Sequence, residues 1–168
     1  MRQPSLFGET ATRNGARDCW ATPRSLFAAL DAEFVFVRDL AAEAWSTKVP
    51  GAYFTREDDA LTRDWHTAGG WQFLNPPFSE IPAWVGKARR EAELGARIVM
   101  VLPAHRCEQP WFHEHVIGHA REVRMIRRRV NYIPPPGIKS SGAEFASMVV
   151  VYDRTPAAGV NTQLRGQG

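Results

Sequence analysis

Four consecutive residues, Asn75-Pro76-Pro77-Phe78, combine groups that suit the binding of an amine on a flat ring. The side-chain oxygen of Asn75 is a hydrogen-bond acceptor. Pro76 has no N–H and little conformational freedom, so its carbonyl oxygen can point in the same direction. Two acceptors that converge suit an amino group, which has two protons to donate, and Phe78 offers an apolar face for the ring. The alternative is an ordinary turn that contains a buried phenylalanine.

The residues before this motif predict a short strand that ends at Asn75. Trp71-Gln72-Phe73 is an apolar run that follows two glycines, which is typical of a buried strand. Two consecutive prolines then prevent the ladder from continuing and prevent entry into a helix. In open α/β sheets, ligands bind outside the carboxyl ends of the strands. We therefore expect Asn75 to lie in a ligand site at such an end.

Two aspartates form a second group of candidate residues. Asp39 lies near the end of a β-branched and aromatic run over residues 34–40, which we expect to be the central strand. The small Ala41 beside it lets a ligand approach the backbone, and a carboxylate can bind a cationic or hydroxyl-bearing group. Asp59 with Leu61 can hold an adenine ring by its amino edge and its face. The usual glycine-rich cofactor motif is absent, and the alternatives are a helix N-cap at Asp39 and a solvated acidic turn at Asp59.

Helical patterns alternate with strand patterns around these residues. Thr22 is a natural N-cap and Pro23 a natural first helical residue, and the apolar spacing predicts a helix that ends near Glu33. A second helix is expected from about Ile81 to Gly95, followed by a buried strand over residues 96–102. A strand–helix–strand unit of this length implies a parallel pair with a right-handed crossover. We therefore expect an α/β fold.

Arginines gather near two late strands, which are expected over residues 122–126 and 146–152 as an antiparallel hairpin on the sheet edge. Of the 21 basic residues in the chain, three are lysine and 18 are arginine, which favours bidentate contacts to phosphates and guanine edges. The candidate phosphate contacts are Arg124, Arg127, Arg128 and Arg129, with Lys139 in the exposed loop over residues 134–142. The alternative is a solvated basic edge that discourages strand pairing.

Length and composition predict a single domain over residues 18–153, with a flexible arm over residues 1–17 and a disordered tail over residues 154–168. The 168 residues carry a formal charge of +3, and 44% of them are hydrophobic. No apolar run reaches membrane-spanning length and no signal-peptide pattern is present. Because only two cysteines occur, a reducing cytoplasm is expected rather than a disulfide scaffold.

A histidine-rich segment raises the question of a zinc site. Its candidate ligands are His105, Cys107, His113, His115 and His119. Their spacing matches no common zinc site, and a helix would place His113 and His115 on different faces. We expect no metal here and an exposed helix instead.

Taken together, these motifs resemble the phage-type DNA N6-adenine methyltransferases, the Dam-like family of phages and prophages, from about Asp18 to Tyr152. The ordered motifs are Asp18-x-Trp20-x-Thr22-Pro23, Phe34-x-Phe36 leading to Asp39-Leu40-Ala41-Ala42, Asp59-Ala60-Leu61 with Trp65, Asn75-Pro76-Pro77-Phe78, Trp84-Val85-x-Lys87-Ala88, Leu102-Pro103-Ala104, Trp111-Phe112 and Arg129-Val130-x-Tyr132. Two positions depart from the pattern: Phe78 stands where tyrosine is commoner, and Ser46-Thr47 precedes Lys48 where an asparagine is expected.

The resemblance implies a Rossmann-like methyltransferase fold, with a mostly parallel sheet and an antiparallel last strand. It implies that S-adenosylmethionine is the cofactor. It also implies that the target adenine binds at the motif Asn75-Pro76-Pro77-Phe78. The implied cofactor residues are Trp20, Thr22, Pro23, Asp39, Ala41 and Asp59, with Leu61 beside the adenine ring. The implied partner is double-stranded DNA, and we expect a monomer or weak homodimer in the cytoplasm of a bacterial host.

The implied reaction is methyl transfer to adenine N6, which is unreachable inside a duplex. We therefore expect the base to be flipped out and stacked against Phe78 and Tyr132. Two alternatives remain open. One is a silent DNA-binding or anti-restriction relative that keeps the fold, and the other is methylation of a different amine, such as cytosine N4, an RNA base or a protein glutamine.

Overall fold

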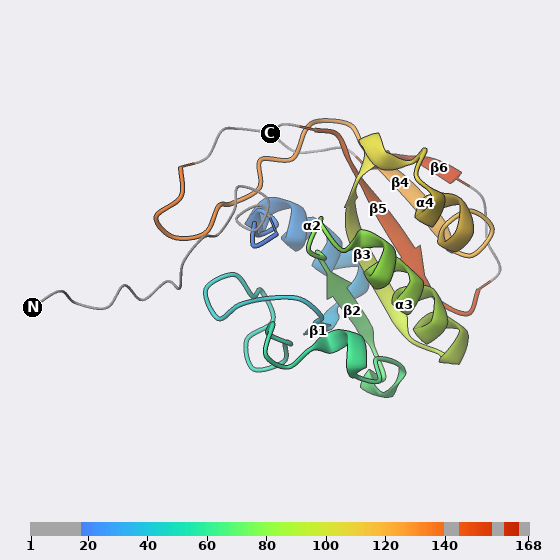
Figure 1. Ribbon diagram of the computed structural model, residues 1–168, viewed down its shortest axis with the longest axis horizontal. Coiled ribbons are helices and arrows are strands. Elements are labelled where there is room, and N and C mark those ends of the chain that lie inside the picture. The colour runs from blue at the N-terminus through green and yellow to red at the C-terminus, as the bar shows by residue number, and fades with distance from the viewer. Residues whose placement is uncertain (1–17, 140–144, 156–159, 165–168) are drawn as a thin grey trace, which may run out of the picture.

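A six-stranded sheet forms the centre of the computed structural model, which describes residues 18–139 and 145–155 and the backbone of residues 160–164. The strand order is β1-β2-β3-β5-β4-β6 (Figure 1). The strands are β1 (Phe36–Asp39), β2 (Trp71–Leu74), β3 (Arg97–Pro103), β4 (Glu122–Ile126), β5 (Ser147–Tyr152) and β6 (Val160–Leu164). The helices are α2 (Arg24–Phe34), α3 (Ile81–Leu94) and α4 (Pro110–His115), with short 3-10 turns η1 (Ala60–Thr62), η2 (His66–Ala68) and η3 (Ala104–Arg106).

The pairing of the strands is mixed. β1 pairs with β2, β2 with β3, and β4 with β6 in parallel. β5 is antiparallel to both of its neighbours, β3 and β4. The α/β class and the antiparallel late strand were expected from the sequence, and both are confirmed.

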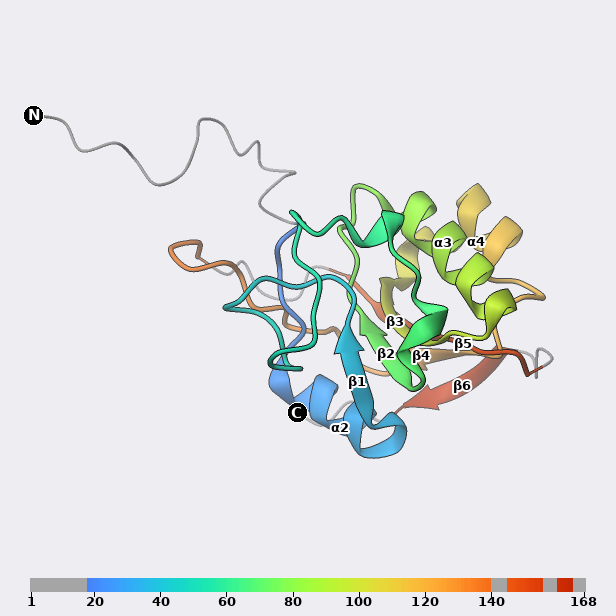
Figure 2. The same ribbon diagram turned by 90° about the horizontal axis from the view of Figure 1, so that it is seen from below.

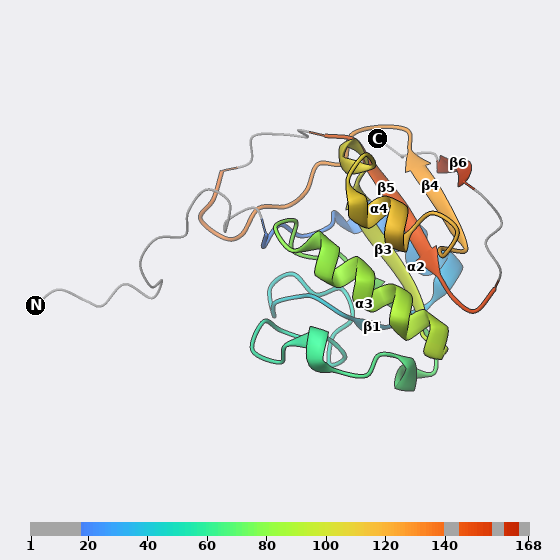
Figure 3. The same cartoon turned by 45° about the vertical axis from the view of Figure 1, so that its right-hand side comes forward.

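Helices cover both faces of the sheet, and the side chains of β3 divide between the two cores. Ile98, Met100 and Leu102 pack with residues of α3 and α4, whereas Val99 and Val101 pack with residues of α2. Figure 2 shows α3 and α4 on one side of the sheet and α2 on the other, and Figure 3 shows α3 and α4 in front of it. This alternation follows from the two-residue period of a strand.

The helix boundaries follow local signals with one exception. Pro82 lies in the first turn of α3, and Gly95 ends the helix with a φ of +114°, which glycine tolerates without a steric cost. α2 begins at Arg24, but Pro23 stands at the N-cap and no side chain caps the helix. The expected N-cap role of Thr22 is therefore wrong. Thr22 is buried, and its hydroxyl group has no hydrogen-bond partner among the described residues.

Three expectations about the sheet are corrected. β1 is an edge strand rather than the central strand, and Phe34 belongs to α2. The late hairpin lies inside the sheet rather than on its edge, because β5 sits between β3 and β4. β3 and β5 take the centre because nearly all of their residues are buried, whereas β1 exposes Val37.

The third correction concerns the tail. Residues 160–164 form β6 beside β4, within the segment that was expected to be disordered. The expected flexible arm over residues 1–17 and residues 140–142 of the Gly/Ser loop lie outside the described residues. No helix that the structure describes has the length and apolar character needed to cross a membrane.

A buried carboxylate on α3 holds the irregular stretch between β1 and β2 against the sheet. Glu91 is 3% exposed, and its Oε2 accepts hydrogen bonds from the backbone N–H groups of Trp65 (2.9 Å) and His66 (3.0 Å). The same oxygen lies 2.8 Å from His66 Nδ1, and Lys87 Nζ donates to Oε1. Burial raises the pKa of Glu91, but these hydrogen bonds outweigh it and hold the pKa at about 2.

We expect Glu91→Gln to lower the free energy of unfolding at neutral pH by about 3 kcal/mol, which corresponds to the lowered pKa. Because the folded-state pKa lies below the ordinary value of 4.5, this stability is present above about pH 4.5 and is lost as the pH falls towards about 2. Urea unfolding over this pH range measures the difference. Glu93→Gln, an exposed change on the same helix, is the control, and parallel pH curves for wild type and Glu91→Gln would contradict the assignment.

Candidate active site

A cavity of about 500 Å³ opens at the carboxyl ends of β1 and β2. The two ends lie side by side because Leu40 N donates to Phe73 O at 2.8 Å, one residue beyond the register pair of Asp39 with Phe73. The stretch after β1 forms much of the cavity wall, and its residue Tyr53 makes a parallel bridge to Asp39. The expectation that ligands bind at the carboxyl ends of the strands agrees with this location.

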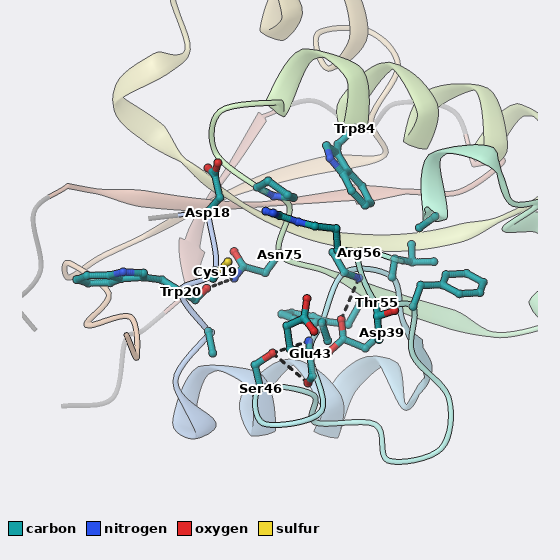
Figure 4. Close-up of a pocket in the computed structure, with 18 of the residues that line it drawn as sticks. Asp18, Cys19, Trp20, Asp39, Glu43, Ser46, Thr55, Arg56, Asn75 and Trp84 are labelled. Atoms are coloured by element: carbon teal, nitrogen blue, oxygen red, sulfur yellow. Dashed lines mark hydrogen bonds between the residues drawn. The ribbon is translucent and has the colours of Figure 1, made fainter. Parts of the chain in front are cut away.

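Most of the candidate cofactor and motif residues meet in this cavity. Its lining includes Trp20, Thr22, Asp39, Ala41, Asp59, Leu61, Asn75 and Pro77. Pro23, Pro76 and Phe78 are absent from the lining, and Pro76 is buried. Figure 4 shows that the labelled side chains come from segments far apart in the sequence and surround one space.

Asn75 presents an acceptor that the rest of the described protein leaves unused. Its Nδ2 donates to the carbonyl oxygen of Trp20 at 2.7 Å, as the dashed line in Figure 4 shows. Its Oδ1 is buried and accepts no hydrogen bond from any described residue. Turning the amide over would set Oδ1 against the Trp20 carbonyl, and two acceptors repel. Because a buried acceptor without a partner is costly, Asn75 is suited to a ligand that donates a proton.

Asp39 is the buried charge of the cavity. The residue is 3% exposed, and burial raises the pKa of its carboxyl group to about 7. Hydrogen bonding to the backbone of Ala41 and the nearby ammonium group of Lys48 oppose this rise without cancelling it. A cationic ligand placed beside Asp39 would favour the carboxylate form. The other candidate aspartate, Asp59, is exposed and lines the cavity at the start of η1.

Several cavity residues had no role in the sequence interpretation. Glu43, Lys48, Arg56 and Trp84 line the cavity, and the indole N–H of Trp84 is buried without a partner among the described residues. Lys48 donates to Ser46 O at 2.7 Å, and burial lowers its pKa. Glu43, Lys48 and Arg56 lie in a stretch without helical or strand periodicity, so no pattern indicates which of them face inward. Trp84 belongs to the motif Trp84-Val85-x-Lys87-Ala88, but the sequence analysis assigned it no role.

Phe78 lies on the other side of the motif, in an aromatic cluster. Its ring centre is 5.7 Å from that of Tyr132 and 5.5 Å from that of Phe145, with edge-to-face geometry in both pairs. Arg106 Nη1 donates to Phe78 O at 3.0 Å. Tyr132 is 5% exposed and its hydroxyl group lies 3.0 Å from Ser147 Oγ, so in this structure its ring supports Phe78.

The candidate phosphate-binding residues differ in their surroundings. Arg127, Arg128, Arg129 and Lys139 are exposed. Arg124 is instead held by Glu33 through two hydrogen bonds of 2.6 Å, and by Glu122. Arg124 therefore joins α2 to β4, and its guanidinium group is already occupied.

The histidine-rich segment places no cluster of metal ligands within the described residues. Among the described residues, potential metal ligands converge at a different place, where ligand atoms of Asp64, His66 and Glu91 lie close together. Both oxygens of Glu91 already accept hydrogen bonds, including one from Lys87. This group therefore has a structural role, in which Glu91 holds the chain around His66 against α3.

Replacing Asp39 by asparagine tests its raised pKa. Because the folded-state pKa of about 7 exceeds the ordinary 3.8, the wild-type protein is stabilised by the bound proton below pH 3.8 and loses this contribution as the pH rises to about 7. An asparagine side chain cannot ionise, so the stability of Asp39→Asn relative to wild type should rise over this range and then level off. Thermal melts of both proteins at several pH values measure this difference in stability. Asp64→Asn, an exposed change, is the control, and a difference that is independent of pH would contradict the assignment.

Comparisons with known proteins agree with these motifs. The model of the family "DNA N-6-adenine-methyltransferase (Dam)" matches residues 9–163. A curated relative, the DNA N-6-adenine-methyltransferase of Escherichia phage T1, is 33% identical over 105 residues, which are 62% of this chain and 43% of the relative. The chain thus spans less than half the length of that relative. Because the family match covers almost all of the chain, the protein belongs to the DNA N-6-adenine-methyltransferase (Dam) family.

Proposed function

We propose that this protein transfers a methyl group from S-adenosylmethionine to the N6 amino group of adenine in double-stranded DNA. Family membership supports the proposal, and its central observation is the unpartnered acceptor Asn75 Oδ1 beside a cavity lined by Asp39 and Asp59. The proposal includes a Rossmann-like methyltransferase fold, a monomer or weak homodimer, and action in the cytoplasm of a bacterial host. The parallel β1-β2-β3 unit and the antiparallel β5 support that fold.

The cavity suits the proposed cofactor in size and charge. Its volume of about 500 Å³ lies within the range of small-molecule sites. Asp39 is placed for the cationic or hydroxyl-bearing part of the cofactor, whereas Asp59 and Leu61 are placed for the edge and face of its adenine ring. Bound S-adenosylmethionine supplies an electrophilic methyl group on a sulfonium.

In this proposal, Asn75 and Pro76 activate the target amine by accepting hydrogen bonds from its two N–H groups. Adenine N6 is a poor nucleophile because its lone pair is delocalised into the ring. Hydrogen bonds to Asn75 Oδ1 and to the Pro76 carbonyl favour a pyramidal amine and free that lone pair. The two prolines set the turn before the reaction begins, so the protein needs little reorganisation in the transition state.

The target base must leave the duplex to reach this turn. Phe78 then provides a stacking face, and Tyr132 and Phe145 hold its ring from the sides. The exposed residues Arg127, Arg128, Arg129 and Lys139 contact the DNA phosphates in this proposal.

Mass spectrometry of nucleosides tests the proposal directly. Plasmid DNA from cells that express the protein should contain N6-methyladenine, whereas DNA from cells that express Asn75→Ala should contain far less. N4-methylcytosine in place of N6-methyladenine would overturn the substrate assignment. Unmodified DNA, together with the absence of cofactor binding in calorimetry, would indicate a silent relative and overturn the proposed activity.

We expect Asn75→Ala to reduce the rate of methyl transfer about a hundredfold, because one preorganised acceptor is worth about 3 kcal/mol in the transition state. Cofactor affinity should barely change, since the lost hydrogen bond is to the base. Single-turnover rates on one adenine-containing duplex and calorimetric cofactor binding measure the two effects. Thermal melts control for folding, and equal rates in two equally stable proteins would remove Asn75 from the chemistry.

The double change Arg127→Ala and Arg128→Ala should weaken DNA binding about uniformly across sequences. It should also flatten the dependence of affinity on salt, because fewer counterions are released. Fluorescence anisotropy at several salt concentrations measures the slope. Arg97→Ala, an exposed arginine at the amino end of β3, is the matched control. An unchanged slope in the double variant would place the DNA on another surface.

A further inference from the structure

The segment Asp18–Ala21, here called the strap, is hydrogen-bonded to the first residue of the Asn75–Phe78 motif and to Ser79, the residue just after the motif. Asp18 Oδ1 accepts from Ser79 N at 2.9 Å, and Asp18 Oδ2 accepts from Ser79 Oγ at 2.6 Å. Trp20 O accepts from Asn75 Nδ2 at 2.7 Å. The strap therefore crosses the motif and is attached just after it and at its first residue. Asp18 thus accepts two hydrogen bonds with its carboxylate, and such bonds are stronger than neutral ones of the same geometry and exposure.

The strap is also attached on its other side. Ala21 N donates to Ile133 O, and Ile133 N donates to Ala21 O, both at 2.8 Å. This pair of backbone bonds joins the strap to the chain that follows Tyr132, whose ring supports Phe78. The position of the Trp20 carbonyl is therefore determined from both sides rather than by its bond to Asn75 alone.

The hydrogen bond from Asn75 to Trp20 O requires a donor in the side chain at position 75. An asparagine can donate to the Trp20 carbonyl with its nitrogen and still offer an oxygen to a ligand. An aspartate carboxylate has no proton to donate, so one of its oxygens would face the carbonyl and be repelled. If the carboxyl group of such an aspartate were protonated, its O–H could donate to the Trp20 carbonyl.

We propose that Asp18 is a positioning residue, which holds the strap so that the Trp20 carbonyl orients the amide of Asn75 and directs Oδ1 at the target amine. The same contact selects asparagine over aspartate at position 75. The kinetic part of this inference rests on the proposed function, whereas the orientation of the Asn75 amide is independent of it.

Nuclear magnetic resonance of the side-chain amides tests the orientation without any activity. With 15N-asparagine labelling, Asn75→Asp identifies the Asn75 signal by its loss. In Asp18→Ala, the Asn75 amide signal should shift, and its protons should exchange with water about tenfold faster or more, because the bond to Trp20 O is loosened. Ser79→Ala, which removes only the hydroxyl contact, should give a smaller change in the same direction. Asp64→Ala is the control and should leave the signal unchanged.

Kinetics test the consequence for methyl transfer. At saturating cofactor and about pH 8, we expect Asn75→Asp and Asp18→Ala each to lower the single-turnover rate about tenfold or more. The rate of Asn75→Asp relative to wild type should rise as the pH falls, because the protonated carboxyl group can donate to Trp20 O. Asp18→Ala should add little to Asn75→Asp, since both changes act on the same orientation.

The outcomes distinguish a failure of the positioning role of Asp18 from a failure of the proposed methyltransferase function. An unchanged Asn75 signal in a folded Asp18→Ala protein overturns the positioning role, and so do additive rates or a pH-independent rate ratio for Asn75→Asp. A shifted Asn75 signal in a wild-type protein that methylates no DNA supports the positioning role and overturns the proposed function alone. Folding is checked by thermal melts, and Ser79→Ala tests the same contact where Asp18→Ala does not fold.

Discussion

The parallel pairing of β1 with β2 brings Asp39 and Asn75 to the same edge of the sheet, and the site depends on it. Leu40 continues the pairing beyond β1 by donating to Phe73 O at 2.8 Å. A buried carboxyl group and a buried amide from strands more than 30 residues apart thereby line one cavity. Strand ends can hold such groups without hydrogen bonds from the ladder, because the ladder stops there.

The cavity combines two buried polar groups whose requirements differ. Asp39 has a raised pKa because burial disfavours its charge, and a positive ligand would relieve that penalty. Asn75 has its donor satisfied by Trp20 and its acceptor unsatisfied among the described residues. Each group is costly in the unliganded protein and favourable with a suitable partner, which is the usual relation between stability and function at binding sites.

The walls of the cavity depend on residues that never touch it. Glu91 accepts hydrogen bonds from the backbone of Trp65 and His66, which fixes the irregular chain that carries Asp59. Trp65 also stacks on Trp84, with 6.1 Å between ring centres, and Trp84 lines the cavity. The second core, around α2, supports the opposite side of the sheet. The cavity is therefore held between elements that the packing of both cores fixes.

The sequence by itself determined the local elements and the chemistry of the motif. The helix that ends at Gly95, the strands on either side of it and the turn at Asn75 follow from side-chain period, glycine and proline, which act within a few residues. The family follows from ordered motifs, and the match over residues 9–163 confirms it.

Only the tertiary structure decided the strand order, the tail strand β6 and the orientation of Asn75. The strand order depends on which apolar runs are buried on both faces, and β3 and β5 exclude β1 from the centre. The partners of Asn75 and Glu91 lie 55 and 26 residues away, at Trp20 and Trp65. Contacts at such separations leave no periodic signal in the sequence, because they arise from how the elements pack and not from the spacing of neighbouring residues.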